Sequence, residues 1–318
     1  MSCFDAFYSC SETKRYGWEE KMKQSHSLHR ENIAACILVG IAAFLCFFPL
    51  WVIVVNSFNS ETNVTLNGFS IFPKVLTLDS FKYVLNNKKT LLLRAFGVST
   101  VTVVAGTIFT TFVTICYAYT AAQDKQTVPF ANTLSFIAWF ATVFSGGVIP
   151  WYILTTQYYG LKNNLFALFV PYAINVFNMY IVRSSFRSTP RALIESAKLD
   201  GASELRVFLS IAIPLSKVSI VTIIMFTALT YWNDFFLSLY LITDSALFPV
   251  QKILYSMMSN ITFLLSGSEA TSAMADIELP ANTARMVMTV LTVIPIAFVF
   301  PFVQKYFVKG ITIGAIKG

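Results

Sequence analysis

The chain has 318 residues, of which 56% are hydrophobic and only 12% are charged, and its formal net charge is +7 at pH 7. Soluble domains carry about 25% charged residues, so this composition excludes an ordinary soluble domain and predicts an all-α integral membrane protein. The basic excess is typical of residues that flank membrane spans, and we expect no nucleic-acid partner. The five cysteines form no C-x-x-C pair and the two histidines have no further ligand nearby, so neither a disulfide framework nor a metal site is expected.

Six apolar segments, taken in chain order, predict six transmembrane helices. The first, 33–55, has 23 residues without a charge, enough to cross about 30 Å of hydrocarbon at about 1.5 Å per residue. The others cover 95–122, 128–162, 165–182, 218–234 and 286–303. The third is longer than one span needs, and we expect Gly146, Gly147 and Pro150 to break it.

The distribution of basic residues predicts the orientation of these spans. With six spans both termini lie on one side, and the segments on that side hold 15 of the 23 lysines and arginines, against eight on the other. Cytoplasmic segments are enriched in these residues, so both termini are expected in the cytoplasm. The predicted organisation is therefore a cytoplasmic segment 1–32, a six-helix transmembrane domain 33–308 and a cytoplasmic tail 309–318.

A polar loop, 183–217, separates the fourth and fifth spans and is expected in the cytoplasm. Residues 192–199 are good helix formers, and Asp200-Gly201 predicts a turn, because glycine accepts a positive φ at little cost. A second short helix is expected at 202–209, and Pro214 is expected to break the chain before the fifth span. Two short helices joined at a glycine would make a rigid knob that is suited to transmitting force.

The same loop carries a spaced motif that marks a family. It consists of Glu195, Ser196, Ala197, Gly201, Ile211 and Pro214. This spacing resembles the permease subunits of bacterial ABC importers, whose signature is E-A-A, three residues, G, nine residues, I-x-L-P. The chain departs from it at Ser196 and Ile213. The resemblance implies a type I importer permease fold, in which this loop docks on an ATP-binding subunit through Glu195, Ser196, Ala197, Asp200 and Gly201, with Ile211 and Pro214 closing the motif.

Further segments are similar to the carbohydrate-uptake branch of that family. They are the Gly146-Gly147…Pro150 element, the Tyr231-Trp232-Asn233 triplet and the tail at 304–310. Within that branch they resemble the maltose-type second permease, and most closely a subgroup for oligosaccharides or polysaccharide fragments. The resemblance implies a heterodimer with a second permease, two ATP-binding subunits, an extracellular sugar-binding protein and a place in the bacterial cytoplasmic membrane. It also implies that residues 309–318 contact the ATP-binding dimer; the other interpretation of this segment is a frayed basic tail.

The chain lacks the G-x-x-x-x-G-K-[ST] motif that cradles nucleotide phosphates. We therefore expect no cofactor in this chain, with ATP and Mg²⁺ bound by the partner subunits. It also lacks H-E-x-x-H, G-x-S-x-G and paired carboxylates within a span, so no enzymatic activity and no catalytic residue are expected.

A pathway for sugar needs aromatic rings for stacking and polar groups for hydrogen bonds, and polar residues inside spans tend to face the bundle interior. The candidates are Asn175, Asn178, Tyr231, Trp232, Asn233 and Asp234. The two asparagines are three residues apart and would share a helix face. The other interpretation is that these residues hold helices together or lie in the interfacial belt.

Two other functions stay open at this point. One is an ABC importer for a solute other than sugar, which the loop motif alone does not exclude. The other is a secondary transporter that uses an ion gradient, with Asp234 as the proton-carrying group. Secondary carriers often show internal repeats and charged residues at mid-membrane. Here no repeat is evident and the spans are nearly free of charge, which favours the ATP-driven importer.

Overall fold

The computed structural model describes residues 35–72, 75–124, 126–266 and 281–315. These residues form helices and connecting turns without any β-strand, as the composition predicts. The long helices are Ala35–Ser57, α3 (Asp79–Ala122), α4 (Ala131–Val143), α6 (Val176–Arg187), α10 (Lys217–Asn233), α12 (Val250–Ser266) and α13 (Ala281–Ala315). The short elements are α2 (Glu61–Asn67), α5 (Val148–Ile153), η1 (Leu154–Tyr158), η2 (Leu165–Leu168), η3 (Val170–Tyr172), α7 (Arg191–Leu199), α8 (Glu204–Val207), η4 (Phe208–Ala212), α9 (Ile213–Leu215), α11 (Phe236–Leu241) and η5 (Ser245–Leu247).

Three of these helices contain a stretch that is long and apolar enough to cross a membrane: Ala35–Ser57, Lys89–Ala122 of α3 and Asn282–Val299 of α13. Three further candidates are pairs of helices with a sharp bend between them. The bends are 119° after α4, 54° before α6 and 78° before α10. The described part of the chain therefore has between three and six spans, and the predicted break of the third segment coincides with the 119° bend.

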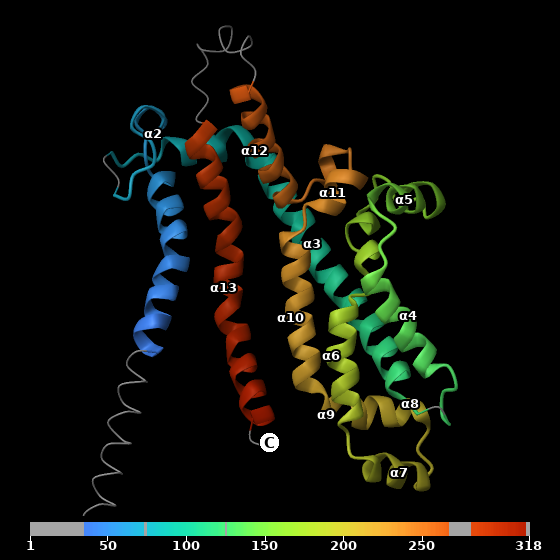
Figure 1. Cartoon of the computed structure of the whole chain (residues 1–318). Helices are drawn as coiled ribbons and strands as arrows, with labels where there is room; N and C mark the ends of the chain where they lie inside the picture. The colour runs from blue at the N-terminus through green and yellow to red at the C-terminus, as the bar shows by residue number, and fades with distance from the viewer. Residues whose placement is uncertain (1–34, 73–74, 125, 267–280, 316–318) are drawn as a thin grey trace, which may run out of the picture.

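Helix α3 is the central element of the bundle, and it packs against α10, α6 and α13 (Figure 1). α7 and α8 project from one end of the bundle, whereas α2, α5, α11 and α12 gather at the opposite end. The beginning of the first helix and the end of α13 both point toward the end that carries α7. Because α3 runs the length of the bundle, it connects the two ends physically.

Several predicted boundaries differ from the structure. α3 begins at Asp79, well before the predicted start at 95, and α13 begins at Ala281 rather than 286. Helix α12 lies between the fifth and sixth predicted spans, in a stretch for which the sequence predicts no span. The first turns of α3 and helix α12 contain Lys and Asn side chains, so hydrophobicity alone does not identify these segments as helices.

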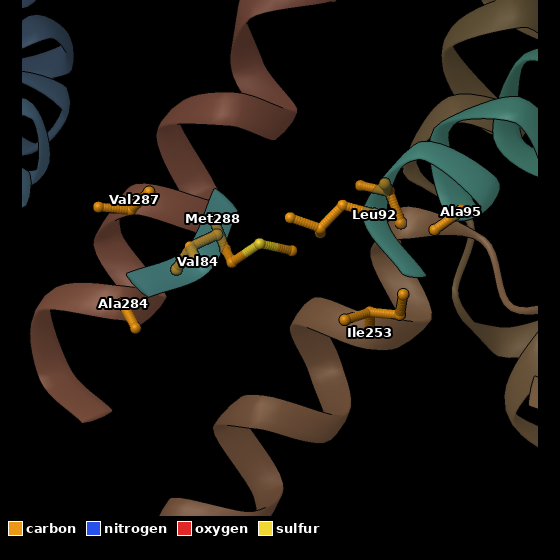
Figure 2. Close-up of a cluster of buried hydrophobic side chains, with 8 residues drawn as sticks. Val84, Leu92, Ala95, Ile253, Ala284, Val287 and Met288 are labelled. Carbon is orange, nitrogen blue, oxygen red and sulfur yellow. The ribbon is translucent and has the colours of Figure 1, made fainter. Parts of the chain in front are cut away.

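The buried cluster in Figure 2 explains why these polar segments are helical. It joins the first half of α3 to α12 and α13, and its members are Val84, Leu92, Ala95, Val250, Ile253, Ala284, Val287 and Met288. Val84, Leu92 and Ala95 recur on one face of α3, at the spacing of an amphipathic helix. Burial of this face stabilises a helix that composition would assign to a loop.

The carboxylate of Glu61 fixes the start of α13 from outside that helix. It accepts hydrogen bonds from the backbone N–H groups of Asn282 and Thr283, at 2.9 and 2.8 Å, and from the Thr283 hydroxyl at 2.6 Å. Unpaired N–H groups and the helix dipole make a helix N-terminus favourable for an anion. Glu61 lies in α2, so this contact joins the segment after the first helix to α13.

Candidate functional site

The first half of the loop 183–217 folds as the sequence predicts. α7 covers Arg191–Leu199, and Gly201 follows with a φ of +80°. The backbone N–H of Gly201 donates to Lys198 O at 3.0 Å and that of Ala202 to Ala197 O at 2.9 Å, which closes the last carbonyls of the helix. Nothing lies within 4 Å of a Cβ built on Gly201, so its backbone angle alone favours glycine there.

The second half of the loop contains the predicted second helix, but this helix extends further along the chain than predicted. α8 begins at Glu204, where the Ser203 hydroxyl accepts from Arg206 N, and the helix continues through the π-helical turn η4 into α9. Pro214 lies in α9, directly after the π-helical turn η4, and does not break the chain. The break comes at Ser216, where the chain bends by 78° into α10.

The knob formed by α7 and α8 presents apolar side chains to its surroundings. No residue of α7 is buried, and Leu199 is 89% exposed. Leu193 and Leu205 are exposed as well, next to exposed Glu195 and Ser196. Exposed apolar side chains on a projecting element are a common feature of surfaces that contact another molecule.

The motif residues occupy different positions on this knob. Glu195, Ser196 and half-buried Ala197 belong to α7, with exposed Asp200 and Gly201 in the turn that follows. Half-buried Ile211 lies in η4, and exposed Pro214 lies in α9. The twenty residues of the motif therefore run from α7 of the knob to η4 and α9, which lead into α10.

A polar cavity of about 450 Å³ lies between α3, α6 and α10. Its lining residues are Thr110, Tyr172, Ile174, Asn175, Asn178, Thr227, Thr230, Tyr231, Asn233, Asp234, Phe235 and Phe236. Five of the six predicted pathway residues are among them, and Trp232 is the exception. Thr227 and Thr230 come one helical turn before Tyr231 and Asp234, a spacing of four that would have predicted both threonines for the same face.

Both asparagines line this cavity as predicted, but only Asn178 lies within helix α6. Asn175 precedes α6, and its side-chain oxygen accepts from Asn178 N at 3.0 Å, capping the helix. Asn178 is buried, and its amide donates to the Thr227 hydroxyl of α10 at 3.2 Å. The segment before α6 contains Pro171 and folds as 3₁₀ turns, which is why the helix starts eleven residues later than the predicted start at 165.

Tyr231 lines the cavity, and its hydroxyl makes two hydrogen bonds that fix its position. Its hydroxyl donates to Phe169 O at 2.9 Å and lies 2.6 Å from the Thr110 hydroxyl of α3. Gly106, one turn earlier in α3, allows this approach, because an added Cβ would lie 2.8 Å from the tyrosine ring. A glycine at this crossing therefore brings α3 and α10 close together.

Trp232 faces the other side of α10. Its indole N–H donates to Thr292 O of α13 at 3.3 Å, and its ring lies 6.4 Å from that of Phe96. It lines a separate, almost wholly apolar cavity of about 600 Å³ between α3, α10 and α13. Trp232 therefore does not contribute to the cavity that its neighbour Tyr231 lines.

Asp234 provides the one charged side chain among the residues that line the polar cavity. One of its carboxylate oxygens accepts from Leu237 N at 3.1 Å, and Tyr172 lines the same cavity. The neighbouring Asn233 amide donates to Leu229 O at 2.9 Å. The cavity therefore combines aromatic rings, hydroxyl groups, amides and one carboxylate. Among the residues described, no group of three His, Cys, Asp or Glu side chains is placed to hold a metal ion.

Comparison with known proteins identifies the class of protein that has this bundle and loop. Residues 126–313 match the family described as "Binding-protein-dependent transport system inner membrane component", and the chain belongs to that family. It is a membrane protein with the type I ABC permease fold and serves as the permease subunit of an importer. ATP hydrolysis belongs to partner subunits, and a substrate-binding protein is a further partner.

Individual relatives align along almost the whole chain. "Protein LplC" of Bacillus subtilis is 38% identical over 305 residues, which cover 93% of this chain and all of the relative. The "Polygalacturonan/rhamnogalacturonan transport system permease protein YtcP" of the same species is 32% identical over 87% of this chain and 94% of its own. A bacterial ABC transporter involved in the import of the acidic polysaccharide alginate has a chain that matches with a TM-score of 0.74 and 27% identity, covering 87% of this chain and 96% of that one.

Proposed function

We propose that this chain is one of two different permeases in an importer that moves oligosaccharides across the bacterial cytoplasmic membrane. It would pair with a second permease, two ATP-binding subunits and an extracellular sugar-binding protein. The observation that carries the proposal is the polar cavity between α3, α6 and α10. Relatives that are named for the transport of polysaccharides and oligosaccharides support the same solute class.

The chemistry of the cavity suits a saccharide. Tyr172 and Phe236 offer ring faces against which the apolar face of a sugar ring can stack. Asn175, Asn233 and several threonine hydroxyls offer hydrogen-bond partners for sugar hydroxyls. Pockets for small molecules are mainly apolar with a few placed polar groups. Asn178 and Tyr231 are already engaged in helix–helix bonds, so we assign them to the wall of the pathway and the others to solute contact.

The proposed topology has six spans with both termini in the cytoplasm. It follows if each bent helix pair counts as one span, and the basic residues then favour the side that carries the knob. In this arrangement residues 33–308 form the transmembrane domain and 1–32 the cytoplasmic N-terminal segment. The region 309–315 continues α13 as helix, and we propose that the tail 309–318 approaches the ATP-binding subunits.

We assign the knob to docking on an ATP-binding subunit. Glu195, Ser196 and Leu199 on α7 provide an exposed charge, a hydroxyl and an apolar contact, and Asp200-Gly201 fixes the turn beside them. Ile211 and Pro214 connect the knob to α10. ATP-driven closure of the two ATP-binding subunits would move the knob. The helices attached to the knob would then rotate, so that the cavity opens to the outer side of the membrane instead of the cytoplasmic side. ATP and Mg²⁺ would bind to the partner subunits in this scheme, and we expect no cofactor in this chain.

The carboxylate of Asp234 supports the runner-up function, an ion-coupled secondary transporter, because a carboxyl group in a solute cavity can carry a proton. An importer of a non-sugar solute is a further alternative, since amides and hydroxyls also bind other polar solutes. The exposed knob has no part in the ion-coupled scheme, and we therefore rank the ATP-driven importer first.

The test is ATP hydrolysis and uptake with the complete complex in lipid nanodiscs and liposomes. We expect hydrolysis to rise when a cognate oligosaccharide and its binding protein are added. Glu195→Lys should abolish uptake while the complex remains in the membrane, because it reverses an exposed charge of the docking surface. Full transport by this variant would refute the docking role. Uptake by the chain alone, driven by an ion gradient, would favour the secondary transporter.

A further inference from the structure

Glu204 joins three segments of the chain at the base of the knob. One of its carboxylate oxygens accepts from the Tyr119 hydroxyl at 2.6 Å and from the Gln123 amide at 3.3 Å, both at the end of α3. The other oxygen lies 2.8 Å from the Lys198 ammonium of α7. A single side chain of α8 therefore connects the projecting helix of the knob to the central helix of the bundle.

An aromatic cluster lies next to this polar contact. The Tyr119 ring packs edge-on against Phe186 of α6, with centroids 5.5 Å apart, and lies tilted against Phe208 of η4, with centroids 4.6 Å apart. Phe186 and Phe208 are 6.4 Å apart. Aromatic pairs of this geometry contribute beyond the area they bury. The Tyr119 ring is therefore packed against α6 and η4, and its hydroxyl is hydrogen-bonded to Glu204 of α8.

The connection matters because α3 is not a sequence neighbour of the knob. The chain attaches the knob only to α6 and α10. Helix α3 lines the polar cavity through Thr110, which contacts Tyr231. From Tyr119 to Thr110 is nine residues along one helix, or roughly 13 Å. A displacement of the knob can therefore reach the cavity through α3 if α8 and α3 move as one body.

We propose that Glu204 is a positioning residue that makes α3 follow the knob during the transport cycle. This role rests on the proposed docking of the knob on an ATP-binding subunit. The carboxylate binds Lys198 in α7, the helix proposed to dock on the ATP-binding subunit. It also binds Tyr119 in α3, the helix that lines the polar cavity. When the Tyr119 contact is lost, α6 and α10 still move with the knob, whereas α3 lags behind them. ATP hydrolysis then continues, and less solute is moved for each ATP hydrolysed.

Tyr119→Phe tests this role with the least disturbance, because the ring and its aromatic contacts remain. The measurements are uptake and ATP hydrolysis by the complete complex, with basal hydrolysis and membrane content as references. We expect unchanged basal hydrolysis and about fivefold less solute moved per ATP, since a hydrogen bond to a charged group is lost at a partly exposed site. Glu204→Gln, which keeps an oxygen acceptor for Tyr119, should restore part of the loss seen in Glu204→Ala.

Asp124→Asn is the matched control. Asp124 forms a 3.2 Å ion pair with Arg191 between the end of α3 and α7, and the two side chains are 60% and 77% exposed. Exposed pairs contribute little, so this variant should transport like the wild type. If Tyr119→Phe and Asp124→Asn reduce the solute moved per ATP equally, any polar contact between the end of α3 and the knob has the same effect. That result would overturn the specific role of Glu204.

Cross-linking distinguishes one rigid body from a joint that opens. Tyr119→Cys with Glu204→Cys, in a Cys116→Ser background because Cys116 lies beside the same contact, can be bridged by a short bifunctional thiol reagent. If α3 and α8 move together, the bridged complex keeps its transport and exceeds the unbridged double variant. Loss of transport on bridging would show that the two helices separate during the cycle and would refute the proposal.

The two proposals fail in different ways. A wild-type complex without any oligosaccharide-stimulated hydrolysis would count against the proposed solute. The contact between α3 and the knob is tested without solute. Spin labels on α3 and α7 measure how the distance between these two helices changes when ATP binds. The proposal requires that distance to stay constant in the wild type and to change in Tyr119→Phe. A constant distance in both would overturn it.

Discussion

Gly106→Ala probes the crossing of α3 and α10 that supports the polar cavity. A Cβ at this position would lie 2.8 Å from Tyr231 Cε2, 2.9 Å from Tyr231 Cζ and 2.9 Å from Phe169 Cβ. The ring could move, but it is buried and its hydroxyl is bonded to both Thr110 and Phe169 O. The Phe169 Cβ cannot rotate away, because its position follows the backbone. The helices must therefore separate.

Whether Gly106→Ala stabilises or destabilises the protein depends on how the gain in helix propensity compares with the cost of disturbed packing and hydrogen bonding. Alanine is favoured over glycine in a helix by about 1 kcal/mol. Inserting one carbon into a packed interior costs about 1–3 kcal/mol, and weakening a buried hydrogen bond of Tyr231 costs about 1 kcal/mol more. The contacts need about 0.6 Å of movement to return to an ordinary 3.4 Å. We expect a net destabilisation of about 1–3 kcal/mol.

Gly97→Ala is the control on the same helix. Nothing lies within 4 Å of a Cβ built there, so only the gain in helix propensity remains and the variant should be as stable as the wild type or more so. Thermal unfolding of the purified protein in detergent measures both, and we expect a lower midpoint only for Gly106→Ala. An equal or higher midpoint for Gly106→Ala would refute the close packing of α3 on Tyr231.

Two further substitutions test buried polar contacts. Asn178→Leu should lower stability by about 1–3 kcal/mol, because the buried Thr227 hydroxyl loses its partner; thermal unfolding should show partial recovery in the double variant with Thr227→Val, and additive losses would contradict the contact. Lys252→Met should cost about 2–3 kcal/mol, because the ammonium donates to Ser238 O and Ile242 O at 2.7 and 2.8 Å and holds the end of α11. Limited proteolysis near α11 should be faster in this variant, and an unchanged cleavage rate would contradict its bridging role.

The class of protein follows from the sequence because its causes are local or compositional. A long run without charge must be buried in lipid or protein, and six such runs predict a helical membrane protein. The loop motif has the same character. Helix propensity over 192–199 and a glycine that accepts positive φ are properties of neighbouring residues, and α7 and the turn at Gly201 form as predicted.

The arrangement of the polar side chains was decided by the tertiary structure. Asn178 and Thr227 are far apart in sequence and meet only because α6 packs on α10. Trp232 is the neighbour of Tyr231, yet it faces α13, since the rotation of α10 in the bundle determines which side each residue takes. Helix α12 and the first turns of α3 are stabilised by mutual burial. Glu204 has no distinguishing local pattern, and its contact with Tyr119 exists because the knob folds back against α3. Hydrophobicity and backbone propensity act within a few residues, whereas the position and contacts of these groups depend on how whole helices pack together.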